Sequence, residues 1–451
     1  MSVLMYIRRG KSFNVNAILK VIEDAKKGLI VEEKGYFIRI IKQSDLKNID
    51  FKPIALFFKV ERILEALALN EKVIKLHKIF QPSEGNTLWS IYASLKGRGA
   101  GIGGEEFYYI SEEKAKEYML NKYIGSYLKP LISSPDRLKY FTFTEKDWSI
   151  RKEYMFITNA PRSQLPLEIQ NYIKLGETSI LITKGPNKGR PVSESSVAKI
   201  RKDLGKVEII GQIITFNDWY DLGGIVEVPI YVTYGARYWI RFALANFQCA
   251  LDHRILALIP KQGLQFDEVE LKALLAYLNS SFSQLQAEIK GRTAGGVALL
   301  ELDVKPLSDF LILDIKKLPR EEIEKLAQLF DKLEAKAREI GGADTLENVF
   351  GSETAKELTG RSDIKSGVDG LFNTVIKEID NEISRILGIE FVENIRTIVL
   401  DLAERRLARA EEAKKEAIKG SEEFVEIRKP KTKRKEVKGI NIRLDQFAER
   451  S

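Results

Sequence analysis

The chain has 451 residues, 44% of them hydrophobic, so it is long enough for two or three domains with buried cores. Lys and Arg number 72 against 64 Asp and Glu, and the net charge of +8 suits a polyanionic partner. The single cysteine excludes an internal disulfide and a multi-cysteine zinc site, and two histidines disfavour a histidine-rich metal site. No run reaches the roughly 18 apolar residues of a membrane span, and the start lacks a secretory pattern, so we expect a cytoplasmic protein with no membrane partner.

Residues 1–75 mix short helical and strand patterns, and we interpret them as a junction that docks on a larger partner. The spacing predicts a helix over 17–27, a strand over 35–41 and a second helix within 51–69. The apolar residues of that second helix fall on one side: Ile63, Leu64, Leu67 and Ala68.

Residues 76–315 form the expected main body. Apolar runs separated by glycine, proline and asparagine predict strands over 140–143, 154–158, 179–183, 207–215, 224–234, 238–244 and 254–259. This pattern favours an α+β fold in which a mainly antiparallel sheet, or a partly closed barrel, carries inserted helices. Helices and strands alternate too poorly for a doubly wound parallel sheet.

The stretch 271–315 dominates this body. Its first half places Leu271, Leu274, Leu275, Leu278, Phe282, Leu285 and Ile289 on one face at helical spacing, which predicts an amphipathic helix packed on a core. A segment with three glycines and two cations follows at 290–296, and glycine lets backbone approach a ligand closely. Two apolar runs at 297–302 and 310–315 then predict strands on either side of Pro306.

The chain becomes helical and charged after residue 315, and we expect a helical domain over 316–420. The first helix begins around Ile323, a second spans 371–387 and ends at Gly388, and a third is lined by Ile395, Ile398, Val399 and Leu402. Residues 428–438 carry seven cations and one acid, and we interpret 421–451 as a flexible basic tail.

Several loops of the body combine cations with glycines or aromatic residues. They lie at 96–104, 184–190, 234–239 and 290–296, and on one side of the molecule they would offer cations to phosphates and side chains to base edges. The candidate DNA-binding residues in these loops are Lys96, Arg98, Gly99, Gly101, Lys184, Lys188, Arg190, Arg237, Trp239, Lys290, Arg292 and Thr293.

Each candidate also has a structural interpretation. Gly97 to Gly104 lacks the Gly-Lys-Ser/Thr ending of a P-loop and could be a plain turn. Lys290 and Arg292 follow a helix C-terminus, where cations are favourable without any ligand. The run 237–239 could be strand packing, in which alternation sends Tyr238 to the face opposite its neighbours. The run Asp252-His253-Arg254 has residue types found in catalytic sites, but no serine or cysteine nucleophile can be assigned to it. We therefore prefer a structural role for His253.

The order of these motifs resembles the target-recognition region of gamma-class DNA N6-adenine methyltransferases of restriction–modification systems, including the fused restriction-methylation type. The resemblance covers most of 40–410. It rests on Leu278-Asn279-Ser280-Ser281, then Gly291-Arg292, Gly295-Gly296 and a closing apolar strand. Two upstream stretches agree, namely the glycine-rich 97–104 followed by the aromatic 106–110, and 127–132 with Phe143-Thr144.

The catalytic motifs of that family are missing from this chain. Its chemistry needs a glycine-rich turn after a strand for S-adenosylmethionine, and an Asn/Asp-Pro-Pro-Tyr/Phe motif for the flipped adenine. No Pro-Pro pair occurs in the sequence, and Gly99-Ala100-Gly101 lacks the flanking strands. We therefore expect no catalytic residues, metal or cofactor in this chain, with S-adenosylmethionine bound by a partner.

The resulting hypothesis is a double-stranded DNA recognition subunit, or fragment, that works with a separate methyltransferase subunit. Two alternatives stay open. A specificity subunit of a multi-subunit restriction complex should show two similar recognition halves, and no such duplication is visible. A nuclease with a hidden carboxylate site is the other, although Pro135-Asp136 and Glu145-Lys146 lack the Glu-x-Lys spacing.

Overall fold

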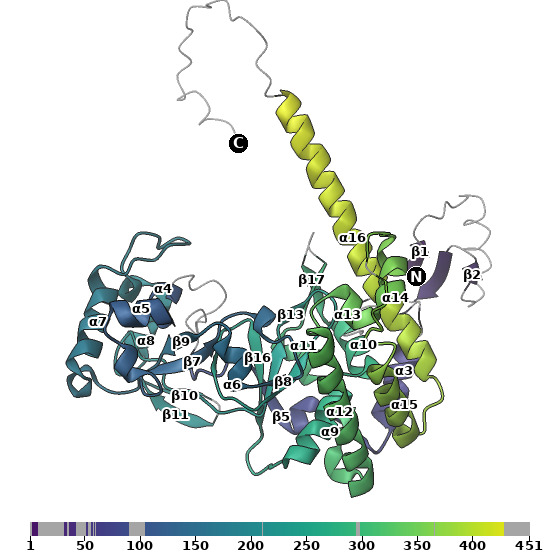
Figure 1. Ribbon diagram of the computed structural model, residues 1–451, viewed down its shortest axis with the longest axis horizontal. Coiled ribbons are helices and arrows are strands. Elements are labelled where there is room, and N and C mark those ends of the chain that lie inside the picture. The colour runs from purple at the N-terminus through teal and green to yellow at the C-terminus, as the bar shows by residue number, and fades with distance from the viewer. Residues whose placement is uncertain are drawn as a thin grey trace, which may run out of the picture.

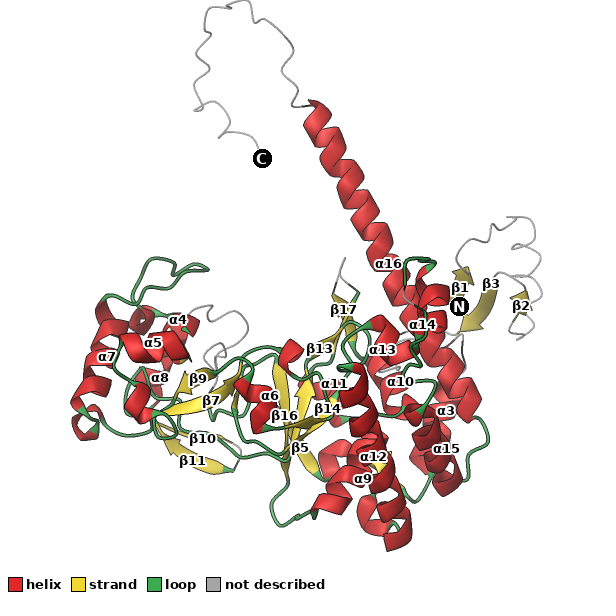
Figure 2. Cartoon of the chain, in the orientation of Figure 1, coloured by secondary structure: helices red, strands yellow, loops and turns green. Residues whose placement is uncertain are grey.

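The computed structural model of the chain describes residues 2–7, 31–33, 36–41, 51–52, 56, 58, 60–89, 104–209, 211–294, 298–364 and 366–427. Within these ranges the chain forms helices and several small sheets, which confirms the predicted α+β class (Figure 2). Most neighbouring strands are antiparallel, as expected, and none of these described sheets closes into a barrel.

A five-stranded sheet lies at the centre of the molecule. Its strand order is β5 (Phe80–Glu84), β16 (Ile255–Pro260), β12 (Ile230–Thr233), β14 (Phe242–Ala245) and β8 (Thr142–Phe143). Alternate residues of a strand point to opposite faces, and here the two faces belong to two different cores. Val232 packs in one core and its neighbour Tyr231 in the other.

One of these cores belongs to a lobe at the left of Figure 1. Its sheet has the order β15 (Ala250–Leu251), β7 (Leu128–Ile132), β9 (Glu153–Phe156) and β6 (Tyr109–Ser111). The remaining elements of the lobe are α4 (Glu105–Tyr108), α5 (Glu112–Glu117), α6 (Glu145–Ser149), α7 (Leu167–Thr178), α8 (Ser196–Leu204) and the hairpin of β10 (Lys206–Ile209) with β11 (Gln212–Thr215).

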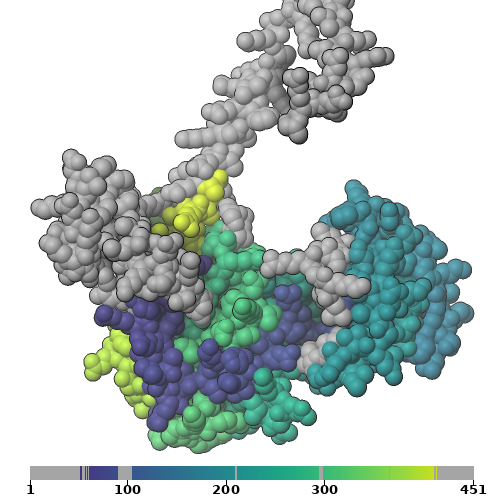
Figure 3. All heavy atoms as spheres, turned by 180° about the vertical axis from the view of Figure 1, so that it is seen from behind, coloured from purple at the N-terminus to yellow at the C-terminus, as the bar shows by residue number. Residues whose placement is uncertain are grey.

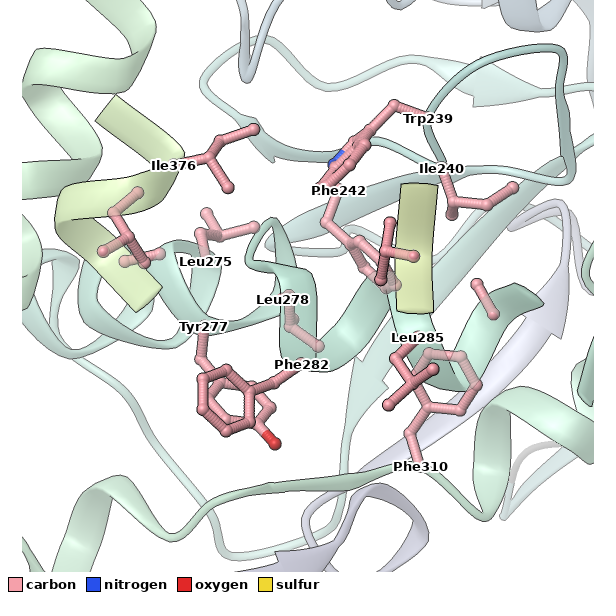
Figure 4. Packing of buried hydrophobic residues seen from close by; sticks show 14 of the residues in the cluster. Trp239, Ile240, Phe242, Leu275, Tyr277, Leu278, Phe282, Leu285, Phe310 and Ile376 are labelled. Carbon is pink, nitrogen blue, oxygen red and sulfur yellow. The ribbon is translucent and has the colours of Figure 1, made fainter. Parts of the chain in front are cut away.

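The second core joins the other face of the central sheet to the helices that follow it (Figure 4). Residues on both sides of the predicted boundary at 315 contribute to this core. Its helices are α3 (Val60–Leu69), α9 (Glu268–Leu278), α10 (Ser281–Lys290), α11 (Val304–Ser308), α12 (Arg320–Ile340), α13 (Leu346–Phe350), α14 (Ser352–Thr359), α15 (Val375–Leu387) and α16 (Val392–Ile427).

Three further small sheets complete the described structure. The sheet β1 (Ser2–Ile7), β3 (Tyr36–Ile41), β2 (Val31–Glu33) contains the strand predicted over 35–41, and β19 (Leu311–Leu313) pairs with β4 (Val73–Lys75). The third has the order β13 (Gly235–Ala236), β18 (Leu299–Glu301) and β17 (Arg292–Ala294). The helix predicted over 17–27 and the tail after 427 lie outside the described residues.

The helix predicted over 271–289 differs from the structure in two respects. The chain breaks at Asn279 and Ser280 into α9 and α10, and residues 273–289 are buried on every side rather than along one stripe. The Asn279 side chain accepts a hydrogen bond from the Phe242 backbone N–H (3.0 Å) and donates one to the Phe242 carbonyl (2.8 Å). Asp380 of α15 then accepts from the first N–H of α10, at Ser281 (2.8 Å), and so caps the new helix.

Other sequence predictions need smaller corrections. Residues 179–183 form a single bridge between Leu181 and Pro191 instead of a strand, because the chain turns immediately at 184–190. The aromatic run at 106–110 starts as the short helix α4 before β6 begins. The second and third C-terminal helices are confirmed, and α15 ends at Gly388 with the left-handed φ of 66° that favours glycine.

None of the helices in the described part of the chain combines the length and the apolar character needed to cross a membrane.

Replacing Asn279 with alanine should lower the free energy of unfolding by about 2–4 kcal/mol, because both backbone groups of Phe242 would lose buried partners. Denaturant titration measures this change. Asn121→Ala, at an exposed position, is the control and should change stability by less than about 0.5 kcal/mol. Equal effects in the two variants would show that Asn279 does not link α9 to β14.

Candidate nucleic-acid interface

A cavity of about 750 Å³ opens beside the small sheet of β13, β17 and β18. Its wall also includes the start of β16 and the turn at 134–136. In Figure 1, β13 and β17 lie between the α7 and α8 lobe and the projecting α16. We call the surface formed here by Arg237, Arg254 and Arg292 the saddle floor. The space-filling view from behind shows a hollow between the teal lobe and the rest of the molecule (Figure 3).

Arg292 is held at this cavity by the hairpin of β17 and β18. The register pairs Arg292 with Glu301, and the guanidinium Nε donates to the Glu301 carboxylate at 2.7 Å. Arg292 also donates to the Tyr234 hydroxyl, which in turn donates to Asp303 (2.7 Å). The side chain is still 60% exposed, so it is fixed in direction while its outer face stays open to a ligand.

Arg254 reaches the cavity from the start of β16 and is positioned by a buried carboxylate. Asp252 accepts hydrogen bonds from the Arg254 backbone N–H (2.9 Å), from its Nε (2.7 Å) and from the Tyr109 hydroxyl. Arg254 Nη2 donates to the Ser133 carbonyl (2.9 Å), yet the side chain is 45% exposed. Burial alone would raise the pKa of Asp252, but hydrogen bonds from His253, Arg254 and Tyr109 hold it well below its usual range.

Arg237 is exposed on the cavity rim, in the turn between β13 and β14. Within the described residues its side chain makes no ion pair or hydrogen bond. Its backbone carbonyl instead accepts a hydrogen bond from Arg406 of α16. The backbone is therefore anchored while the guanidinium stays available to an anion.

A second group of cations lies on the other side of β17, around a small pocket of about 70 Å³. Lys52 donates to the Glu288 carbonyl (2.8 Å) and to Thr293 (3.4 Å). Burial lowers the pKa of Lys52, the Glu288 carboxylate opposes this, and Arg406 and Arg409 lower it further. Arg405 and Arg409 of α16 complete the wall. Neighbouring residues of a strand face opposite ways, so Arg292 meets the large cavity and Thr293 the small one.

Gly291 brings the end of α10 against β18. A Cβ atom at this position would lie 2.6 Å from the Ala287 carbonyl oxygen and 2.9 Å from that of Glu301, closer than real Cβ contacts. The glycine therefore serves close approach of the protein to itself. Gly291 therefore has a packing role, whereas the sequence had suggested that it brings backbone to a ligand. Gly295 and Gly296 lie outside the described residues.

The structure places the sequence-predicted site residues in four situations. Arg237 and Arg292 lie together at the large cavity, Thr293 lies at the small pocket on the other side of β17, and Lys290 ends α10 just before them. Trp239 is 1% exposed and packs edge-on against Phe350 and Phe372, so its ring faces the core instead of a base (Figure 4). Lys184, Lys188 and Arg190 are exposed on the separate lobe, between α7 and α8. Lys96, Arg98, Gly99 and Gly101 lie outside the described residues.

Six cations that line the two pockets were not among the site residues predicted from sequence: Lys52, Arg241, Arg254, Arg405, Arg406 and Arg409. Arg254 was noted only as part of the Asp252-His253-Arg254 run. The position of that run could have identified Arg254 as a site residue, because a short polar turn directly before an apolar strand lies at the edge of the sheet. Within the described ranges, no group of three or more His, Cys, Asp and Glu side chains could hold a metal ion.

Asp252 gives a pH-dependent prediction. Because its pKa is lowered on folding, its ion pair stabilises the fold above the unfolded-chain pKa of about 3.9 and loses this effect as pH falls further. Asp252→Asn should cost about 1–3 kcal/mol at pH 7, and the difference from the unaltered chain should shrink as pH falls from about 4 to 3. Unfolding at a series of pH values measures it.

The control for this experiment is Asp203→Asn at an exposed position of α8, which should change stability by less than about 0.5 kcal/mol at every pH. A difference for Asp252→Asn that stayed constant from pH 7 to 3 would contradict the electrostatic role.

No protein-family model and no curated protein matches this chain. Among solved structures, it is similar to the type IIG restriction endonuclease BpuSI, with a TM-score of 0.43 and 12% sequence identity. The match covers 88% of this chain and 38% of that chain, so the chain spans well under half the length of BpuSI.

Proposed function

We propose that this chain recognises double-stranded DNA as the specificity subunit, or fragment, of an S-adenosylmethionine-dependent DNA N6-adenine methyltransferase whose catalytic domain lies on a partner chain. The observation that carries the proposal is the gathering of Arg237, Arg254 and Arg292 at the floor of the saddle, with Lys52, Arg405 and Arg409 beside them. The order of motifs along the sequence supports the same function.

The two groups of cations suit different tasks at a DNA surface. Phosphate contacts give affinity and register, whereas contacts to base edges give sequence specificity. Arg405 and Arg409 lie on a helix that continues outward from the body, where they can follow a phosphate backbone (Figure 1). Arg237 projects from the turn between β13 and β14, and Arg292 projects from β17. A guanidinium held in one direction, as that of Arg292 is by Glu301, can bind guanine through two hydrogen bonds.

In this proposal, two chains have separate roles in methyl transfer. This chain holds the duplex and selects the site, while the partner binds S-adenosylmethionine, extrudes the adenine and methylates it. The lack of any Pro-Pro pair supports a catalytic motif on another chain. Residues 1–75 and the C-terminal helices would provide the docking surface for that partner.

The saddle cations should be tested by duplex binding. The double variant Arg237→Gln/Arg292→Gln should weaken binding by about tenfold or more and reduce the slope of log affinity against log salt by roughly 1–2, because two cationic contacts are lost. Titration of a labelled duplex at several salt concentrations measures both. Lys325→Gln, which removes one positive charge at an exposed position on α12 away from the cavity, is the control and should lower affinity far less.

Unchanged affinity in the double variant would remove the saddle floor from the interface. If only Lys184→Gln/Lys188→Gln weakened binding, the interface would lie on the α7 and α8 lobe instead.

The partner should be tested by reconstitution. A candidate methyltransferase subunit with the Asn-Pro-Pro-Tyr motif should co-elute with this chain in gel filtration, and site-specific methylation should appear only with both chains present. Methylation is measured with tritiated S-adenosylmethionine on a duplex library. Methyl transfer by this chain alone, or metal-dependent DNA cleavage by it, would instead assign it chemistry of its own and reject the proposal.

A further inference from the structure

Arg241 lies on the wall of the 750 Å³ cavity and is 5% exposed. It precedes β14, so its backbone is fixed by the central sheet. Its Nε donates to the Leu138 carbonyl at 2.5 Å, and its Nη1 donates to the carbonyls of Ala343 (3.0 Å) and Trp239 (3.3 Å). Nη2 makes no hydrogen bond within the described residues, and Arg241 is among the residues that line the cavity.

This buried charge has no ion-pair partner within the described residues. In the described part of the chain, no carboxylate forms an ion pair with Arg241, in contrast to the buried Arg396 with Asp380 (2.6 Å) and Arg406 with Glu288 (2.7 Å). Burial lowers the pKa of Arg241 to about 10, and the more distant Asp344 and Asp136 offset this only in part. A buried charge is costly unless it is paired, so an anion entering the cavity would supply the missing partner.

The rest of the cavity suits a ligand larger than a simple ion. Its volume lies within the roughly 300–1,000 Å³ of pockets that enclose small molecules. Tyr234 and Tyr238 offer ring surface, and Arg237, Arg254 and Arg292 stand at the wall around them. Four carboxylates also line the cavity, at Glu84, Asp136, Glu301 and Asp344, and they add hydrogen-bond acceptors of the kind that bind the amino groups of bases.

We propose that this cavity binds one phosphate-bearing nucleotide unit, with the phosphate on Arg241 and the base between the tyrosine and arginine side chains. The unit is either a nucleotide that leaves the stack of bound DNA or a free nucleotide. The first source rests on the DNA-binding function proposed above, and the second does not.

Calorimetric titration of the full chain with 2′-deoxyadenosine 5′-monophosphate tests the pocket without DNA. We expect binding at one site, with deoxyadenosine, which has no phosphate, binding at least about tenfold more weakly, because charge-assisted hydrogen bonds to a buried guanidinium are lost. Arg241→Gln should reduce nucleotide affinity by about tenfold or more, whereas Lys325→Gln should not change it. Equal affinity for nucleotide and nucleoside, or full affinity in Arg241→Gln, would overturn the proposal.

Arg241→Gln changes a buried residue, so its folding is checked by circular dichroism. If the variant does not fold, hydrogen–deuterium exchange of the unaltered chain decides. Added nucleotide should protect amides at 234–241 and 252–254, which surround the cavity. Protection confined to other segments, or none, would overturn the proposal.

An experiment with DNA distinguishes a nucleotide that leaves the stack of bound DNA from a free nucleotide. A duplex with one unpaired nucleotide should bind more tightly than a fully paired duplex, and Arg241→Gln should abolish that preference. Mononucleotide binding without this preference would support the cavity and assign a free nucleotide as its ligand. Tight DNA binding with no mononucleotide binding and no effect of Arg241→Gln would reject the cavity proposal while leaving the DNA-binding function intact.

Discussion

The saddle floor depends on one buried ion pair, between Arg406 of α16 and Glu288 of α10. Both side chains are almost completely buried, at 3% and 2% exposure, and the guanidinium donates to the carboxylate at 2.7 and 3.2 Å. Arg406 also donates to the carbonyls of Arg237 and of Ala298 (2.6 Å). A buried ion pair compensates for lost hydration only when its remaining donors are satisfied, and here the backbone of two saddle turns supplies the acceptors. The same contact that neutralises the pair therefore fixes the position of both turns relative to α16.

The helix pair α9 and α10 provides the frame for this contact through buried amide side chains. Asn279 binds both backbone groups of Phe242, and Gln286 does the same at Leu311, accepting from its N–H (2.7 Å) and donating to its carbonyl (2.8 Å). Gln284 accepts from the N–H of Ile240 (3.2 Å). Asn279 and Gln286 thereby satisfy the N–H and the carbonyl of a strand residue that would otherwise be buried without partners. Polar residues are tolerated inside this helix pair because they form hydrogen bonds with backbone groups of the segments packed against it.

The spacing of apolar residues was sufficient to predict helices whose surroundings stay the same along their length. The helix α12 and the end of α15 at Gly388 follow from apolar spacing and a left-handed glycine, since one face meets the core and the other meets water. The break at Asn279 could not be predicted this way, because its cause is a strand 37 residues earlier in the chain. Trp239 was assigned to the interface for a related reason, since an aromatic residue beside Arg237 has the same local pattern whether it faces a ligand or Phe350. The α+β class and the basic turns were accessible from sequence, whereas the direction of each side chain was set by contacts far along the chain.

Some cations of the saddle bind a carboxylate of the protein, and others have no carboxylate partner within the described residues. Arg292 and Arg254 each bind a carboxylate, which fixes the direction of the guanidinium and removes part of its charge from the surface field. Arg237 on the rim and Nη2 of Arg241 on the cavity wall have no such partner within the described residues. An anion would therefore meet a guanidinium group without an ion-pair partner in the described part of the chain both at the rim and on the cavity wall. An exposed phosphate would first meet the exposed charge of Arg237, and a group that penetrates further would gain the stronger, desolvated contact with Arg241.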